Sequence, residues 1–138
     1  MNQAAFEIQR HVEFYETDGA GIVHFSNFFR YMETCEHAFI RSLGPDFADL
    51  LNGSDSGWPR VNVTCDYRAP ACFGDLLTTR LYVAEVRTRS VRYRFEIAHG
   101  EVLVAEGTIA VAHVKKTEDG LKAMPLPGGL REKLLSCV

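Results

Sequence analysis

One long amphipathic segment, residues 26–43, constrains the fold more than any other feature of this sequence. Its apolar residues recur at steps of three and four, the spacing that gathers side chains on one face of an α-helix. They are Phe28, Phe29, Met32, Cys35, Phe39, Ile40 and Leu43. Ser26 or Asn27 is suited to cap the start of this helix, and Gly44-Pro45 ends it. The predicted helix is about 18 residues, or roughly 27 Å, long, so the rest of the chain must cover its apolar face.

Strand-like segments supply that cover. Residues 6–14 alternate imperfectly between apolar and polar side chains, which is typical of a half-buried strand. Four more such segments follow the helix, at residues 60–67, 75–86, 90–98 and 101–115. The last two are joined by a tight His99-Gly100 turn, as in an antiparallel hairpin. We therefore expect an α+β fold in which a five-stranded antiparallel sheet wraps around one long central helix.

The remaining segments do not divide the chain. Residues 46–59 form a polar-ended connection with room for one short helical turn. The C-terminal stretch LREKLLSCV predicts a short amphipathic helix. No internal repeat, low-complexity stretch or linker is present, so residues 1–138 are predicted to form a single domain.

Composition and charge exclude several classes of protein. The sequence is 46% hydrophobic and 24% charged, as in a soluble globular protein. Its formal net charge of −3 argues against broad nucleic-acid binding. It has no apolar run of about 18 residues that could span a membrane, and no secretory signal at the N-terminus. The four cysteines include no C-x-x-C pair, which suggests neither a disulfide framework nor a metal site. We expect a cytoplasmic protein without a nucleic-acid or membrane partner.

The stretch YETDGAGIVHFSNFF, residues 15–29, changes from an acidic, glycine-broken turn to the aromatic start of the helix. The residues alone leave two interpretations of Asp18. It is either a turn-forming aspartate whose side chain bonds the backbone two residues on, or a reactive carboxylate.

This stretch and its continuation carry a family resemblance. Residues 15–44, YETDGAGIVHFSNFFRYMETCEHAFIRSLG, together with YRAPACFGD at 67–75, resemble the hotdog-fold acyl-CoA thioesterases of the 4-hydroxybenzoyl-CoA thioesterase family. The motif is closest to the 4-hydroxybenzoyl-CoA and 1,4-dihydroxy-2-naphthoyl-CoA branches. The matching positions are Tyr15, Asp18, Gly19, Ala20, Gly21, Ile22, Val23, His24, Phe25, Asn27 and Glu33. The resemblance extends over residues 6 to 125.

The resemblance implies hydrolysis of an aromatic or short-chain acyl-CoA. Asp18 would act as the nucleophile or as a general base that activates water. The backbone N–H of Phe25, at the helix start, would polarise the thioester carbonyl. Many relatives carry Tyr or His where this chain has Phe25, so the side chain offers no polar group there. No cofactor is implied, because coenzyme A is part of the substrate.

The same resemblance implies further binding residues, each with a plainer alternative. Substrate contacts are expected from Gly21, His24, Phe25, Asn27 and Glu33. Asn27 is otherwise a helix cap, and Glu33 is otherwise a solvated partner of His37. Contacts to the phosphates of coenzyme A are expected from Arg87, Arg89, Ser90 and Arg92, which otherwise form a solvated hairpin. We also expect a homodimer or a homotetramer, because pairing two sheets removes exposed edges.

Two other functions compete with hydrolysis. One is a hotdog dehydratase, which needs a histidine and an acid that act together. The other is a non-catalytic protein that binds acyl-CoA or an acyl carrier protein, in which Asp18 is only structural. Release of free coenzyme A from aromatic acyl-CoAs separates a thioesterase from both.

Overall fold

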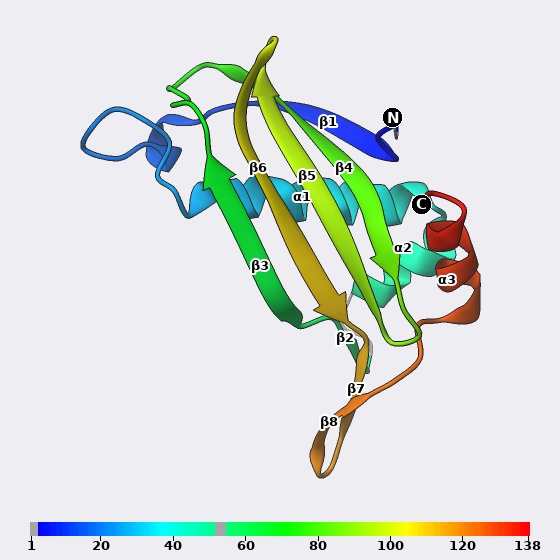
Figure 1. The fold of residues 1–138 in the computed structure, drawn as a ribbon. Helices are drawn as coiled ribbons and strands as arrows, with labels where there is room; N and C mark the ends of the chain where they lie inside the picture. The colour runs from blue at the N-terminus through cyan, green and yellow to red at the C-terminus, as the bar shows by residue number, and fades with distance from the viewer. Residues whose placement is uncertain (1–2, 52–54) are drawn as a thin grey trace.

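A five-stranded antiparallel sheet wraps around one long helix in the structure, which is a computed structural model (Figure 1). The structure describes residues 3–51 and 55–138. The strand order is β1-β4-β5-β6-β3. The strands are β1 Phe6–His11, β3 Arg60–Tyr67, β4 Leu76–Val86, β5 Ser90–His99 and β6 Val102–Ala112. The predicted α+β architecture is confirmed.

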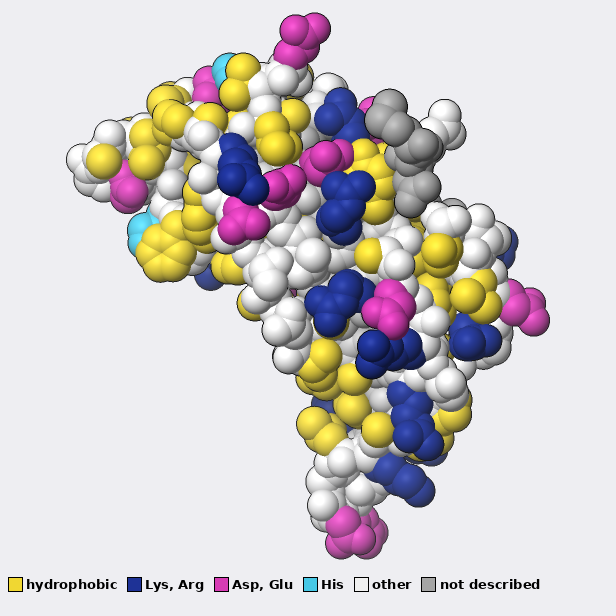
Figure 2. Space-filling view, in the orientation of Figure 1, with side chains coloured by type: hydrophobic (Ala, Val, Ile, Leu, Met, Phe, Trp, Pro, Cys, Tyr) yellow, Lys and Arg dark blue, Asp and Glu magenta, His cyan; other side chains and the backbone are white. Residues whose placement is uncertain are grey.

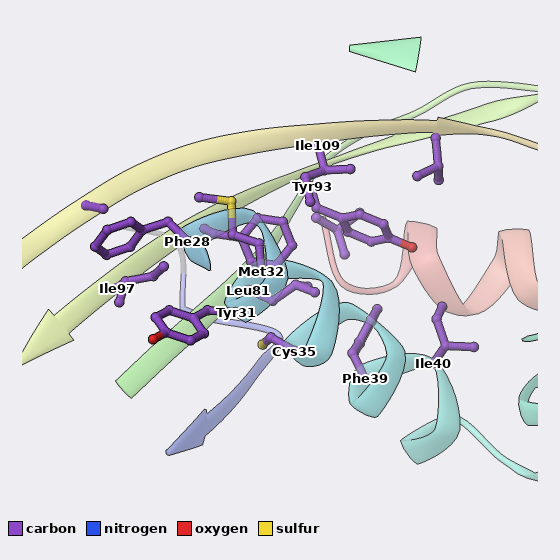
Figure 3. Packing of buried hydrophobic residues seen from close by; sticks show 14 of the residues in the cluster. Phe28, Tyr31, Met32, Cys35, Phe39, Ile40, Leu81, Tyr93, Ile97 and Ile109 are labelled. Carbon is purple, nitrogen blue, oxygen red and sulfur yellow. The ribbon is translucent and has the colours of Figure 1, made fainter. Parts of the chain in front are cut away.

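Helix α1, Asn27–Ser42, lies across one face of this sheet (Figure 1). Its buried side chains are Phe28, Tyr31, Met32, Cys35, Glu36, Phe39 and Ile40. Figure 3 shows the apolar members of this set packed against side chains of β4, β5 and β6, among them Leu81, Ile97 and Ile109. The predicted helix is confirmed, but the Ser26 side chain makes no capping hydrogen bond. Asn27 instead donates its side-chain amide to the Glu16 carbonyl at 2.8 Å.

The first predicted strand is shorter than its pattern suggests. Strand β1 ends at His11, and residues Phe14–Glu16 form a 3-10 turn, η1. The change follows from backbone pairing, because Val12 exchanges hydrogen bonds with the turn before β4. Its N–H donates to the Asp75 carbonyl at 2.9 Å, and its carbonyl accepts the Gly74 N–H at 3.0 Å. This pairing frees the following residues to turn toward the start of α1.

The last predicted strand divides between two sheets. Strand β6 ends at Ala112, and β7, Val114–Thr117, pairs instead with β2, Ser56–Gly57, and with β8, Gly120–Ala123. His113 at the break is buried and stacks on Trp58 with ring centroids 4.6 Å apart. Its Nδ1 is bonded to the Pro125 carbonyl at 2.8 Å. Alternation alone could not predict this break, since both parts continue as extended chain.

Short helices close one end of the core. Helix α2, Pro45–Ala48, and the 3-10 turn η2, Asp49–Leu51, provide the helical turn expected after α1. The rest of that predicted connection includes residues 52–54, which lie outside the described residues. Helix α3, Gly128–Leu135, buries Leu130 and Leu134 and confirms the short C-terminal helix. Among the described residues, no helix is both long and apolar enough to cross a bilayer.

Candidate active site

Asp18 opens a tight turn that ends at Ile22. Its backbone N–H donates to the Ile22 carbonyl at 2.8 Å, and its carbonyl accepts the Gly21 N–H at 3.0 Å. Its carboxylate oxygen Oδ1 accepts the Ala20 N–H at 2.8 Å and the Ile22 N–H at 3.4 Å. Gly21 has φ +82°, a left-handed conformation that glycine adopts without strain. The turn-forming role of Asp18 is confirmed.

The same turn leaves half of the carboxylate available for chemistry. Oδ1 is held by backbone donors, whereas Oδ2 has no hydrogen bond with any residue that the structure describes. A carboxylate fixed through one oxygen presents the other in a defined direction. The structural and the reactive interpretations of Asp18 are therefore compatible.

A cavity of about 370 Å³ lies beside this turn. Asp18 and Phe25 both line it, and most of its other walls are apolar. The complete lining is Asp18, Ile22, Val23, Phe25, Phe28, Tyr67, Arg68, Ala69, Pro70 and Ala71. The Val23 N–H donates to the Ala71 carbonyl at 2.8 Å, which ties the two walls together. The two sequence motifs, far apart along the chain, thus build one cavity.

Phe25, which lines this cavity, has a backbone N–H without a partner in the part of the chain that the structure describes. The preceding His24 N–H donates to the Glu16 carbonyl at 2.9 Å, and the following Ser26 N–H to His24 Nδ1 at 3.3 Å. The Phe25 N–H has no partner among the described residues. It lies two residues before α1, where the helix dipole favours negative charge. A lone N–H in this position can bind the oxygen of a polarised carbonyl.

Tyr67 is a cavity residue that the sequence did not single out. Its hydroxyl donates to the Phe25 carbonyl at 3.2 Å, and its ring meets Phe28 edge-on at 5.4 Å between centroids. It ends β3, immediately before the Arg68-Ala69-Pro70 element. The sequence feature that could have identified Tyr67 is an aromatic residue at the end of a predicted strand, next to the Arg68-Ala69-Pro70 element. Tyr67 links β3 to the peptide unit that follows the free N–H.

His24, Asn27 and Glu33 do not line this cavity. His24 Nδ1 is bonded to Ser26 Oγ at 2.8 Å, and the ring stacks on Phe25. Asn27 and Glu33 line a separate polar cavity of about 460 Å³ on the outer side of α1. Glu33 is half exposed and pairs with Arg60 at 2.9 Å, not with His37. Of the predicted site residues, Asp18 and Phe25 line the apolar cavity, and Gly21 lies in the turn beside it.

The arginine hairpin lies at a distance from Asp18. Arg87, Ser90 and Arg92 line a shallow cavity of about 100 Å³. Arg87 donates to Glu85 at 2.7 Å, and Arg92 to the Asn62 side chain at 3.4 Å. In the orientation of Figure 1, Figure 2 shows Lys and Arg side chains spread over the central and lower part of the visible surface, with acidic side chains among them. Asn62 is near the start of β3 and Tyr67 at its end, so about 17 Å of strand separates the two cavities.

Two buried carboxylates were not expected from the sequence. Glu16 is 4% exposed and pairs with Arg10 at 2.7 Å. Glu36 is also 4% exposed and pairs with Arg60 at 2.6 Å. Burial raises the pKa of Glu36 to about 7, although the Arg60 guanidinium lowers it. The signal for Glu36 was its place on the apolar face of the helix, four residues after Met32.

A five-stranded antiparallel sheet wrapped around one long helix is the hotdog fold. Asp18 and Phe25 line one apolar cavity in this fold. A family model described as the thioesterase superfamily matches residues 20–114. This chain belongs to the thioesterase superfamily, and the predicted family and enzyme class, thioester hydrolase, are confirmed.

Relatives and solved structures agree with this membership. A 1,4-dihydroxy-2-naphthoyl-CoA hydrolase from Acaryochloris marina is 30% identical over 124 residues, which cover 86% of this chain and 87% of that protein. The crystal structure of a 1,4-dihydroxy-2-naphthoyl-CoA thioesterase from Synechocystis has a TM-score of 0.84 at 25% identity, covering 94% of this chain and 95% of that one. A gentisyl-coenzyme A thioesterase structure has a TM-score of 0.81 at 26% identity, with 94% and 98% covered.

Proposed function

We propose that this protein hydrolyses the thioester of an aromatic acyl-CoA, with Asp18 as the reacting carboxylate and the Phe25 N–H as the oxyanion donor. The observation that carries the proposal is that Asp18 and Phe25 both line one apolar cavity. A thioester carbonyl in that cavity would have a carboxylate oxygen on one side and a hydrogen-bond donor for its oxygen on the other. That is the pair of groups which acyl transfer to water requires.

Two routes use this pair. In the first, Asp18 Oδ2 attacks the carbonyl carbon, the C–S bond breaks, and coenzyme A leaves as a thiolate that takes up a proton. The mixed anhydride that forms is then hydrolysed by water, which restores the carboxylate. In the second, Asp18 removes a proton from a water molecule that attacks the carbonyl carbon directly. The C–S bond then breaks, and coenzyme A leaves as a thiolate that takes up the proton. In both routes the Phe25 N–H binds the oxyanion, and the loss of such a donor costs about 100- to 1,000-fold in rate.

The cavity wall supports an aromatic acyl group. Phe25, Phe28 and Tyr67 contribute three aromatic side chains to it, and edge-to-face or stacked ring pairs add about 0.5–1.5 kcal/mol beyond the area they bury. Relatives named for 1,4-dihydroxy-2-naphthoyl-CoA and gentisyl-CoA agree with a hydroxybenzoyl- or dihydroxynaphthoyl-like acyl group. A short-chain acyl-CoA would fill less of the cavity and is the alternative substrate.

We further propose that the protein works as a homodimer, or as a homotetramer of such dimers, joined through β3. This strand is one edge of the sheet, and its side chains Val61, Val63 and Tyr67 are large, apolar and exposed. An exposed apolar edge strand is a surface for strand pairing, and a twofold axis would make that pairing antiparallel. The pairing would continue one sheet across both protomers.

Such a dimer would also bring the two distant cavities together. Antiparallel pairing sets the start of β3 in one protomer beside the end of β3 in the other. The hairpin with Arg87, Arg89, Ser90 and Arg92 of one protomer would then lie near the Asp18 cavity of its partner. These side chains can hold the phosphates of coenzyme A while the thioester reaches Asp18. Glu33, on the outer side of α1, remains a candidate contact to a polar group of the substrate.

The proposal needs no cofactor, since a carboxylate, an N–H group and water suffice. It takes residues 1–138 as one hotdog domain. A cytoplasmic setting is supported by free thiols at Cys35, Cys65, Cys72 and Cys137. A dehydratase is not favoured, because no histidine is among the residues that line the Asp18 cavity in the described chain.

Replacement of Asp18 by Asn tests the assignment. The change keeps the size of the side chain and an oxygen for the Ala20 N–H, so the fold should persist. Free coenzyme A would be measured with benzoyl-, hydroxybenzoyl-, naphthoyl- and short-chain acyl-CoAs. We expect kcat with the best substrate to fall by at least about 100-fold, with KM changed much less.

The matched control is Asp119→Asn, which changes an exposed aspartate in the β7–β8 turn and should leave kcat unaltered. A folded Asp18→Asn variant that hydrolyses its best substrate at the wild-type rate would remove Asp18 from the mechanism. A wild-type protein that binds these compounds but releases no coenzyme A would favour the non-catalytic alternative.

A further inference from the structure

We propose that Glu16 is a positioning residue for hydrolysis, which joins the Asp18 turn to the Phe25 N–H and sets the distance between them. The inference rests on the proposed function, because it concerns how the two halves of that site are held. Glu16 itself is not among the residues that line the apolar cavity. Its effect would pass through its neighbours.

The carboxylate of Glu16 ties three separate elements together. Oε1 accepts the Glu13 N–H at 2.8 Å and the Tyr31 hydroxyl at 3.0 Å, and Oε2 accepts Arg10 Nη2 at 2.7 Å. Arg10 belongs to β1, Glu13 caps η1, and Tyr31 lies on α1. Burial and the adjacent Glu16 carboxylate raise the pKa of Tyr31 well above its usual range, which keeps its hydroxyl proton in place as a donor. Arg10 also lies over the Tyr31 ring, 4.7 Å from its centroid.

The backbone carbonyl of Glu16 holds the other half of the site. It accepts the His24 N–H at 2.9 Å and the Asn27 side-chain amide at 2.8 Å. These two donors stand on either side of Phe25 in the sequence. Glu16 itself stands two residues before Asp18. One residue therefore bonds the segment on both sides of the oxyanion donor and anchors the turn that carries the carboxylate.

Burial of the Glu16 carboxylate opposes folding, so a role in positioning its partners would explain why a charged residue is found there. A carboxylate that is 4% exposed has lost its hydration, and apolar residues of similar volume often replace buried ion pairs without loss of stability. A fully satisfied charge, in contrast, specifies one arrangement of its partners. In this site, misplacement of the reacting groups by about 1 Å can cost roughly 100-fold in rate. Alignment of Asp18 with the Phe25 N–H matters most when the oxyanion forms, so loosening it should lower kcat more than it raises KM.

The test compares two buried glutamates. Glu16→Gln keeps the size of the side chain and the backbone carbonyl but removes the charge that Arg10 faces. Glu36→Gln is the matched control, because Glu36 has the same 4% exposure and a similarly short ion pair with an arginine. Glu36 lies farther along α1 and does not line the Asp18 cavity. Both variants would be assayed well below their melting temperatures.

We expect Glu16→Gln to lower kcat by about 10- to 100-fold with KM within about threefold. Glu36→Gln should shift the melting temperature but keep kcat within about threefold. Tyr31→Phe removes one of the three donors and should lower kcat by a smaller factor, which keeps the inference testable if Glu16→Gln does not fold. Equal kcat values for Glu16→Gln and Glu36→Gln, or a Tyr31→Phe variant with wild-type kcat, would overturn it.

Failure of this inference is distinguishable from failure of the proposed function. If Asp18→Asn is inactive while Glu16→Gln turns over at the wild-type rate, only the role of Glu16 is lost. If Asp18→Asn remains fully active, the reaction assignment itself fails, whatever Glu16 does.

Discussion

Replacing Glu36 with Gln measures what a carboxylate costs in the core of this fold. Glu36 lies on the buried face of α1, and both its oxygens accept hydrogen bonds from Arg60, at 2.6 and 3.1 Å. Burial raises its pKa from 4.5 to about 7, which outweighs the opposing effect of Arg60. In the unfolded chain both influences vanish. The folded protein therefore binds a proton at Glu36 more tightly than the unfolded chain does.

The sign and size of the effect follow from this difference. Because the folded pKa is the higher one, the stability that protonated Glu36 contributes is fully present below pH 4.5 and is lost as the pH rises through 7. The two pKa values differ by 7 − 4.5 = 2.5, and one pKa unit corresponds to 1.36 kcal/mol, which gives about 3 kcal/mol. Glu36→Gln cannot titrate. The wild-type free energy of unfolding should thus fall by about 3 kcal/mol relative to the variant between pH 4.5 and 7.5.

Urea unfolding at a series of pH values, followed by circular dichroism at one fixed protomer concentration, measures this difference. Subtraction of the Glu36→Gln curve removes the contribution of the other titrating groups. Glu33→Gln is the control, because Glu33 pairs with the same Arg60 from a half-exposed position and exposed pairs contribute little. A difference curve that is flat within about 0.5 kcal/mol would refute the conclusion that burial raises the pKa of Glu36 more than Arg60 lowers it. A curve that rises with pH would show that the effect of Arg60 on this pKa is the larger one.

Three further predictions concern coenzyme A, assembly and packing. Arg87→Ala and Arg89→Ala should each raise KM with kcat little changed, and the rise in KM should shrink as salt is added. Steady-state kinetics at two ionic strengths would check this. An unchanged KM in both variants would mean that the hairpin is solvated and does not contact coenzyme A. Val63→Lys should move the protein from dimer toward monomer in sedimentation, whereas a wild-type monomer at micromolar concentration would contradict the β3 interface. Gly107→Ala should lower the free energy of unfolding by about 3 kcal/mol, because a Cβ there would clash with the Thr64 carbonyl and lie 2.6 Å from Met32 Cε. An unchanged midpoint of urea unfolding would contradict this prediction.

The sequence by itself determined the elements whose pattern is local. The helix predicted for residues 26–43 is observed as Asn27–Ser42, and the strand predicted for 60–67 as Arg60–Tyr67. Side chains three and four apart share a helix face, and alternate side chains share a strand face. The buried positions of a helix or a strand can therefore be predicted from the pattern of apolar residues within that element alone. The motif around Asp18 likewise predicted the fold, the family and the enzyme class.

Only the tertiary structure decided which distant groups meet. Glu36 and its partner Arg60 are separated by 24 residues, and Tyr67 bonds a carbonyl 42 residues away, so no short window of sequence contains either pair. The end of β6 at Ala112 was decided in the same way, by the pairing of β7 with β2. A charge can be buried only where its partners converge from several elements. That convergence depends on how the whole sheet closes around α1, which is why Glu16 and Glu36 were recognised only in the folded chain.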